Sequence, residues 1–150
     1  GDRASHAFSG QTRRNRSMFL PPGYAYVYLI YGVWFCINVS SETQGVGAAV
    51  LLRALEPIEG HALMARRRGG GRPQDLAKGP GRLCQAVAID LSCDGADLCG
   101  PGPLWLGNGP RPPRAIGESV RIGLTRDAER VLRFYERGSP FVSGSARLRL

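Results

Sequence analysis

The sequence predicts an α+β fold: a single domain, mainly antiparallel sheet, with a protruding β-hairpin and a few short helices. With 150 residues, 43% of them hydrophobic, the chain is long enough to bury one core. Short runs of aromatic and β-branched residues, typical of strands, dominate the segment from Tyr24 to Leu55 and return near the C-terminus. No apolar run approaches the roughly 20 residues of a membrane-spanning helix, so we expect a soluble protein.

The first part of the chain changes from a loop to strands at Tyr24. Residues 1–23 are polar, basic and rich in turn-forming residues, which predicts a surface loop. Three strands follow, and the first two are joined around Gly32 as a hairpin. They are predicted at Ala25–Ile30, Trp34–Val39 and Ala48–Leu55.

Two short helices are predicted after these strands. The composition of residues 62–65 favours a helix over Gly60–Arg68, which is followed by a basic, glycine-rich loop. Gly79-Pro80-Gly81 introduces a second apolar stretch, Leu83–Leu91, with helical spacing. Short strands are predicted at Leu104–Leu106, Ser119–Gly123 and Leu132–Tyr135.

The charge and the cysteines narrow the class of function. Twenty Lys and Arg against twelve Asp and Glu give a net charge of +8, which favours a polyanionic partner, nucleic acid before an anionic membrane. The four cysteines show neither the CxxC pairs of a zinc site nor the density of a secreted disulfide scaffold, and the chain has only two histidines. We therefore expect reduced thiols and chemistry that uses no metal and no cofactor.

The predicted hairpin has an unusual tip, Tyr31-Gly32-Val33-Trp34. Exposed turns normally carry Asn, Asp, Gly or Ser rather than large apolar groups. In a basic protein such a tip is suited to entering the minor groove of DNA as a wedge. The alternative, that Tyr31 and Trp34 fold back into the core, is the commoner arrangement, and the residues alone leave both open.

Tyr24, Tyr26 and Tyr28 lie on one face of the first strand because side chains alternate along a strand. A wall of tyrosines is either a core layer with satisfied hydroxyls or one side of a slot for a flat ring. An aromatic slot would favour a cationic ring by roughly 0.5–2 kcal/mol, as in an alkylated purine.

Several motifs in chain order carry a resemblance to a known family. They are Ala4-Ser5-His6-Ala7, Gly10-Gln11-Thr12-Arg13-Arg14-Asn15, Tyr26-Val27-Tyr28-Leu29-Ile30-Tyr31-Gly32, Leu51-Leu52-Arg53-Ala54-Leu55-Glu56-Pro57, Gly79-Pro80-Gly81-Arg82-Leu83-Cys84-Gln85-Ala86 and Arg133-Phe134-Tyr135-Glu136-Arg137-Gly138-Ser139-Pro140. Over nearly its whole length the chain resembles the alkyladenine (3-methyladenine) DNA glycosylases. The resemblance implies a fold like that of the formyltransferase C-terminal domain. It also implies a base-excision repair enzyme that flips alkylated or deaminated purines out of duplex DNA and removes them by hydrolysis.

The resemblance also implies roles for individual residues. Tyr31 matches the residue that fills the gap left by the flipped nucleotide, with Val33 and Trp34 pressing on neighbouring bases. His6, Tyr28 and Asn38 match the base pocket, although His6 is otherwise an ordinary loop histidine. Arg53 matches the active-site arginine that positions water and phosphate, whereas its structural alternative is an ion pair with Glu56 or Glu59. Matches to DNA-backbone contacts are Thr12, Arg14, Arg82 and Ser139.

The general base is the part of the family pattern that these residues lack. The family carries its base in a Glu-(Thr/Ala)-Glu-Ala-Tyr segment shortly before the Ser-His-Ala motif, and no such segment precedes His6. Asp2 is the nearest acid but does not match the base. We therefore expect an N-terminally truncated domain over residues 1–150, which binds DNA and excises weakly or not at all.

Three alternatives remain at this level: a non-catalytic DNA lesion-binding module, an RNA-binding domain and a formyltransferase-like C-terminal domain. The expected partner is double-stranded DNA containing damaged purines, with no membrane, and the protein is expected to be a monomer. The expected location is the cytoplasm of a bacterium, in association with the nucleoid.

Overall fold

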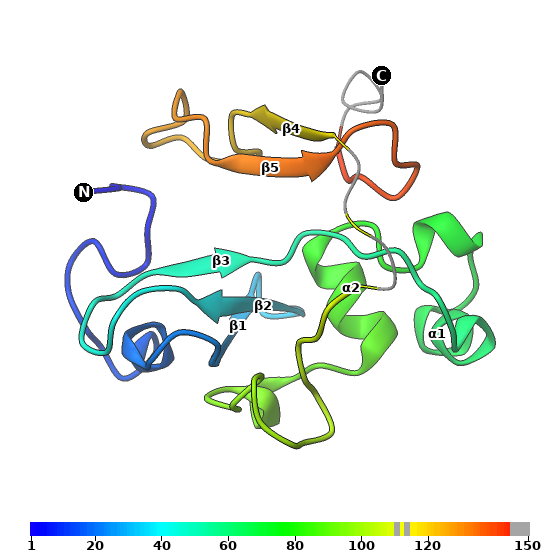
Figure 1. The fold of residues 1–150 in the computed structure, drawn as a ribbon, viewed down its shortest axis with the longest axis horizontal. Coiled ribbons are helices and arrows are strands. Elements are labelled where there is room, and N and C mark those ends of the chain that lie inside the picture. The colour runs from blue at the N-terminus through cyan, green and yellow to red at the C-terminus, as the bar shows by residue number, and fades with distance from the viewer. Residues whose placement is uncertain (110–111, 113–114, 145–150) are drawn as a thin grey trace.

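The computed structural model describes residues 1–109, 112 and 115–144, and these form two antiparallel sheets with short helices (Figure 1). The described part of the chain contains no helix that is both long and apolar enough to cross a membrane. The strands are β1 (Ala25–Ile30), β2 (Trp34–Ser40), β3 (Ala49–Leu51), β4 (Ile116–Ser119) and β5 (Arg133–Glu136). The helices are α1 (His61–Arg68) and α2 (Pro80–Val87), and the 3-10 turns are η1 (Arg16–Phe19), η2 (Pro73–Asp75) and η3 (Leu91–Cys93).

The first sheet has the order β1-β2-β3, and its two faces differ in character. Because side chains alternate along a strand, Ala25, Val27 and Ile37 share one face and pack with α2 in the hydrophobic core. The opposite face carries Tyr26 and Tyr28, which pair across the ladder with Asn38 and Cys36. The sheet therefore has an apolar face against α2 and a second face rich in polar groups.

The β1–β2 hairpin is closed by a tight turn whose backbone favours the left-handed region. Val33 N donates to Ile30 O at 3.2 Å, and the two central residues, Tyr31 and Gly32, have φ angles of 54° and 69°. A type I′ turn requires positive φ at both central positions and matches the twist of a hairpin. Glycine adopts this conformation freely, whereas a tyrosine there is uncommon and strained.

Helix α2 begins earlier than the apolar pattern predicted and ends earlier too. Pro80 lies in the first turn of α2, where backbone N–H groups have no acceptor within the helix, so the N–H that proline lacks costs no hydrogen bond. At the other end Ala88 has a φ of 57° and its N–H caps the helix on the carbonyls of Cys84 and Gln85. The prediction of a helix over Leu83–Leu91 was therefore wrong at both ends, since its last residue begins the separate turn η3.

Three strand predictions also need correction. Strand β3 ends at Leu51 rather than Leu55, because beyond it only single contacts continue the ladder, such as Leu52 N to Ile37 O and a bridge between Ala54 and Lys78. Residues 104–106 form no strand and share one hydrogen bond with Leu98. In the second sheet β4 ends at Ser119, which pairs with Arg133, so the predicted strand Ser119–Gly123 shares only its first residue with β4.

Candidate functional site

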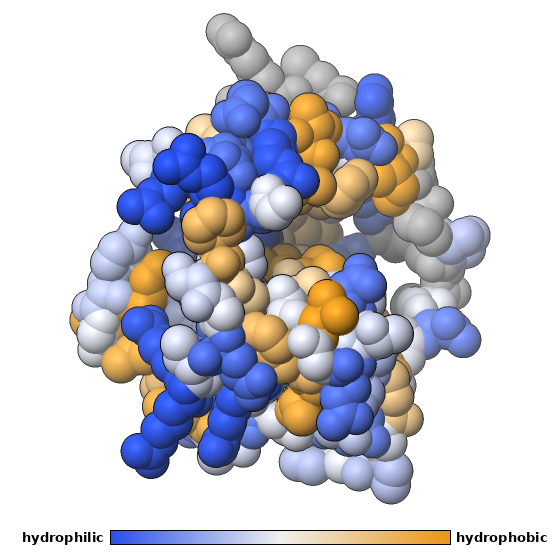
Figure 2. All heavy atoms as spheres, turned by 90° about the vertical axis from the view of Figure 1, so that its left-hand side faces the viewer, coloured by the Kyte–Doolittle hydropathy of each residue, from blue (hydrophilic) through white to orange (hydrophobic). Residues whose placement is uncertain are grey.

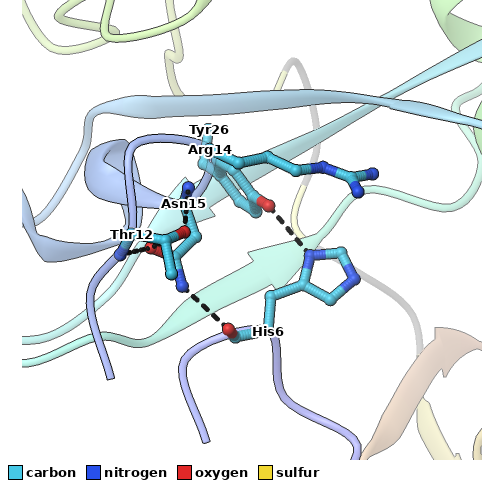
Figure 3. Close-up of a pocket in the computed structure, with 5 residues that line it drawn as sticks. All are labelled: His6, Thr12, Arg14, Asn15 and Tyr26. Carbon is cyan, nitrogen blue, oxygen red and sulfur yellow. Dashed lines mark hydrogen bonds between the residues drawn. The ribbon is translucent and has the colours of Figure 1, made fainter. Parts of the chain in front are cut away.

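The polar face of the first sheet borders a pocket of about 190 Å³ (Figure 3). Its lining brings together the N-terminal loop and β1. Pockets for drug-sized ligands measure roughly 300–1,000 Å³, so this space suits a smaller group such as a single base. The lining residues are His6, Thr12, Arg14, Asn15 and Tyr26.

A buried asparagine gives the pocket loop its shape. The Asn15 amide nitrogen donates to the carbonyls of His6 at 2.8 Å and Gly10 at 3.0 Å, and its oxygen accepts from Thr12 N at 2.6 Å (Figure 3). Asn15 thereby ties His6 to the basic loop that follows it. Asn15 stands between Arg14 and Arg16 in a motif of the sequence, and no local pattern there predicts that its amide joins His6 to Gly10.

His6 and Tyr26 form a hydrogen-bonded pair at the wall of this pocket. The Tyr26 hydroxyl lies 2.8 Å from His6 Nδ1, and Tyr26 is only 1% exposed. A buried hydroxyl needs an acceptor for its proton, and His6 Nδ1 is the partner that the described residues offer. We therefore assign Tyr26 as donor and Nδ1 as acceptor, which leaves the ring proton of a neutral His6 on Nε2.

The electrostatics of the pair agree with this assignment. Burial raises the pKa of Tyr26 to about 12, so its hydroxyl keeps its proton. His6 remains partly open to solvent, yet burial of its ring lowers its pKa and the nearby Arg14 charge lowers it further. Both effects favour the neutral imidazole.

Tyr28 completes an aromatic cluster with His6 and Tyr26. The Tyr26 and Tyr28 rings stack with centroids 5.4 Å apart, whereas His6 meets Tyr28 edge-on at 4.6 Å and 74°. The predicted pocket residues His6 and Tyr28 are thus in contact, although their rings do not form two parallel walls. Burial raises the pKa of Tyr28, so this hydroxyl is also protonated.

Asn38 lies deeper on the same face of the sheet. It is buried, and its side-chain nitrogen donates to the backbone oxygen of Tyr26, its register partner, at 3.0 Å. The amide is therefore oriented by the strand next to it. This bond satisfies part of the hydrogen-bonding need that a buried asparagine has on an apolar strand.

Arg53 follows β3 and is half-buried, with its Nε buried and without a hydrogen-bond partner among the described residues. Burial lowers the pKa of its guanidinium, and the groups that favour its charge are the Cys36 thiol and the Tyr28 hydroxyl. The structure thus places Arg53 beside the aromatic cluster.

The hairpin tip projects into solvent rather than folding into the core. Tyr31 is 86% exposed and Val33 is 66% exposed. Trp34 is partly covered by the start of α2, where a Cβ added to Gly81 would lie 3.1 Å from Trp34 Cβ. Glycine at this position therefore lets the hairpin approach the helix, which supports the tip from one side.

The predicted backbone-contact residues lie in two kinds of environment. Arg14 and Arg82 are exposed, and Arg14 donates to Leu29 O at 2.9 Å near the end of the hairpin strand. Thr12 belongs to the N-terminal loop and lines the pocket. Ser139 is buried, and its hydroxyl accepts from Phe141 N at 3.3 Å within a turn.

None of the described residues that line the pocket around His6 carries a carboxylate. Asp2, the acid closest in sequence to His6, lines a different hollow of about 420 Å³ near the start of β3. Figure 2 shows the side of the molecule on which the N-terminus and the start of β3 lie, with hydrophilic and apolar side chains mixed across it. Asp2 also forms an ion pair with Arg121, and the hydrogen bond from Arg121 lowers the pKa of its carboxyl.

Comparison with known proteins gives one consistent result. The family described as methylpurine-DNA glycosylase (MPG) matches residues 1–140. A protein of Mesorhizobium japonicum named "Putative 3-methyladenine DNA glycosylase" is 60% identical over 144 residues, which cover 96% of this chain and 69% of that protein. A protein of Methanoculleus marisnigri with the same name is 48% identical, covering 95% of this chain and 76% of its own length. The human protein "DNA-3-methyladenine glycosylase" is 46% identical over 95% of this chain and 52% of its own length.

Proposed function

Because the chain belongs to the methylpurine-DNA glycosylase family, whose members act as DNA glycosylases, we propose that it recognises alkylated or deaminated purines in duplex DNA by flipping them into the His6 pocket. The observation that carries this proposal is the pairing of an exposed aromatic tip with an aromatic pocket on the same hairpin. Tyr31 directly follows β1, the strand whose Tyr26 and Tyr28 form the aromatic cluster with His6. One hairpin would therefore both fill the gap that the flipped purine leaves in the duplex and help to form the pocket that receives this purine.

The conformation of Tyr31 supports a role as the wedge. Flipping a base costs a few kcal/mol of lost stacking, and an aromatic ring placed in the gap recovers part of it. Tyr31 is exposed, so its ring adds little to the packing of the free protein, and its positive φ is what the tight turn of the hairpin requires. The turn thus presents the ring to solvent, where it would be able to enter a duplex.

The chemistry of the pocket supports damaged purines as ligands. Methylation at a ring nitrogen such as N3 or N7 gives the purine ring a positive charge, which the face of Tyr28, the less buried of the two stacked tyrosines, would favour. His6 is held neutral, so its ring adds no like-charge repulsion to such a base. Its Nε2–H offers a donor to a purine acceptor. Exposed Arg14 and Arg82 would hold phosphates on either side, which sets register without reading sequence.

Hydrolysis needs a general base that activates water near the glycosidic bond. The described residues that line the pocket provide no carboxylate for this step. We therefore propose that the 150 residues bind the lesion and that removal of the base depends on a carboxylate outside this lining. A non-catalytic lesion-binding role is the second candidate, and the same observation favours it.

The test compares binding with excision on one set of duplexes. Fluorescence anisotropy would measure affinity for a duplex containing one ethenoadenine, the undamaged duplex and single-stranded RNA, while chromatography would measure free base. We expect tighter binding to the damaged duplex and little base release, with the full-length Mesorhizobium relative as the positive control for release. Equal affinity for damaged and undamaged duplex would overturn the binding proposal. Efficient release of the purine by the 150-residue chain would instead show that the general base lies within these residues.

A further inference from the structure

The N-terminal loop is bonded to the connection between β4 and β5 (Figure 1). The Arg121 guanidinium donates to both carboxylate oxygens of Asp2, at 2.9 Å to Oδ1 and more closely to Oδ2. Such a two-point bond fixes the direction of both side chains as well as their separation. The two residues are 119 positions apart in the sequence, so the bond joins the second sheet to the loop that carries His6.

The same connection makes further bonds to the first residues of the chain. The Asp127 carboxylate accepts from Arg3 N at 2.7 Å, and Arg130 donates to the backbone oxygen of Gly1 at 3.0 Å. Arg121 also donates to the backbone oxygen of Asp127 at 3.1 Å, which holds the connection in its own shape. The start of the N-terminal loop is therefore held at several points.

The Arg121–Asp2 pair is largely sheltered from solvent. The side chain of Arg121 is 18% exposed and that of Asp2 is 23% exposed. An ion pair on an open surface holds little, because water and salt screen it and long side chains must be ordered to form it. Arg72 and Asp75 form such a pair, in which the Arg72 side chain is 73% exposed. The sheltered pair is suited to fixing a geometry, and the exposed pair offers a control.

Asp2 passes its restraint on to His6 through two successive turns. Its Oδ1, which the guanidinium binds, also accepts from Ala4 N at 3.1 Å, and its backbone oxygen accepts from Ser5 N at 3.0 Å. The Ser5 hydroxyl oxygen in turn accepts from Ala7 N at 3.2 Å. His6 thus lies in a folded segment that begins at the carboxylate of the ion pair.

A different residue holds the other side of His6. Asn15 donates to the backbone oxygen of His6 at 2.8 Å, and between these two restraints the imidazole meets the Tyr26 hydroxyl at 2.8 Å. A hydrogen bond weakens steeply when its atoms move apart or out of line, so this contact tolerates little movement of the loop. The orientation of the ring therefore depends on restraints from both sides of residue 6, one of which comes from the second sheet.

We propose that Arg121 is a positioning residue that acts on His6 through Asp2. Its bond keeps the loop where the imidazole meets the Tyr26 hydroxyl, so that the neutral ring carries its proton on Nε2. The second sheet contributes none of the described residues that line the pocket, yet it sets the position of one of them. The use of His6 toward a damaged purine rests on the proposed function, whereas the link from Arg121 to His6 concerns the free protein.

Arg121→Lys tests this link without DNA. Lysine keeps the positive charge but cannot bind two carboxylate oxygens with a planar fork, so the loop should loosen and the bond between Tyr26 and His6 should form less often. The pKa of His6 should then rise, because the ring is less buried and Nδ1 becomes free to take a proton, while the charge of Arg14 is unchanged. NMR titration would measure this pKa, with exposed His61 as the reference in the same spectra.

A positioning role predicts coupling between two substitutions. In Tyr26→Phe, which already lacks the hydroxyl, Arg121→Lys should change the His6 pKa much less than it does in wild type. Asp2→Asn, which keeps an oxygen for the backbone but loses the charge, should raise the His6 pKa as Arg121→Lys does. Arg72→Lys in the exposed pair is the matched control and should leave it unchanged.

Two results of these titrations would overturn the proposal, even if the variants are less stable than wild type. One is a His6 pKa that is the same in wild type, Arg121→Lys and Asp2→Asn. The other is an equal rise on Arg121→Lys with and without the Tyr26 hydroxyl, which would mean that the loop does not act through this bond.

Duplex binding shows whether the link serves recognition. Arg121→Lys should bind the ethenoadenine duplex about tenfold more weakly, the effect of losing one hydrogen bond, and should bind the undamaged duplex as wild type does because the net charge is kept. In His6→Ala the same substitution should cost nothing further. An equal loss on both duplexes would overturn the role in recognition. If wild type binds both duplexes equally while the NMR coupling is found, the link between Arg121 and His6 stands and the proposed function fails.

Discussion

At the scale of single residues, the pocket depends on which atoms carry protons. Tyr26 donates to His6 Nδ1, so the imidazole presents Nε2–H and no net charge. Asn15 holds the backbone of His6, and Asn38 is bonded to the backbone of Tyr26. Residues at the pocket are thus held in place by hydrogen bonds to one another. Such support keeps a binding geometry in place before the ligand arrives.

Tyr26→Phe tests the assigned proton positions. Without the hydroxyl, Nδ1 loses a bond that favours the neutral ring, so the pKa of His6 should rise, while the burial and the Arg14 charge that lower this pKa remain. NMR titration of the His6 ring would measure the change, with exposed His61 as the reference in the same spectra. An unchanged or lower His6 pKa in the variant would contradict the assignment.

The same pKa predicts how stability depends on pH. Because the folded protein lowers the pKa of His6, the unfolded chain takes up a proton first as the pH falls below about 6.5. The contribution of His6 to stability is therefore complete above that value and is lost as the pH falls toward the folded pKa. In Tyr26→Phe this loss should be smaller, because the two pKa values lie closer together.

At the scale of elements, the β1–β2 hairpin combines local strain with an exposed aromatic ring. Its backbone follows the requirements of a tight hairpin turn, for which Asn-Gly is the preferred pair. The protein has Tyr31-Gly32 at these positions, a poorer choice for folding. Arg14 and the first turn of α2 support the hairpin near its tip. The element is therefore held rigidly by its surroundings and not by its own turn residues.

Tyr31→Asn should separate folding from binding. Asparagine accepts a positive φ more readily than tyrosine, so the thermal midpoint should stay level or rise. The loss of the stacking ring should weaken binding to a lesion duplex by tenfold or more, since stacking of one base on an aromatic ring contributes about 1–3 kcal/mol. Thermal denaturation and anisotropy would measure the two effects. A variant that loses stability and keeps its affinity would show that Tyr31 serves the fold.

At the scale of the whole molecule, the first sheet has an apolar side and a polar side. Helix α2 covers the apolar face of the first sheet, and the pocket loop and Arg53 lie with the tyrosines of the other face. The net charge of +8 adds a general attraction for a polyanion. The arrangement leaves the hairpin tip and the exposed arginines free to meet a duplex.

Salt dependence tests this charge distribution. If Arg14, Arg53 and Arg82 each neutralise one phosphate, the logarithm of the binding constant should fall with the logarithm of salt concentration with a slope of about −3. Arg14→Ala should reduce that slope by about 1. Arg126→Ala removes an equal charge from the exposed connection between β4 and β5 and should leave the slope unchanged. Equal changes in both variants would mean that only net charge matters.

Local patterns predicted the parts of the fold that depend on near neighbours. Strand β1 was predicted with its observed bounds, β2 to within one residue and helix α1 to within one residue, because alternation and composition act over a few positions. The third strand and the strand at 104–106 were wrong, because strand length depends on a partner that the local pattern does not reveal. The prediction placed α2 too far along the chain, because it followed the apolar run from Leu83 and not the proline at the start of the helix or the left-handed cap at its end.

The sequence by itself determined the family, the basic character, the hairpin with its aromatic tip and the set of residues proposed for the site. These depend on residue identity and on short spacing. Only the tertiary structure decided that Tyr26 bonds His6 and that Asn15 anchors the pocket loop. Proton positions depend on distances between residues that are separated in the chain, and those distances exist only after the N-terminal loop has packed on β1.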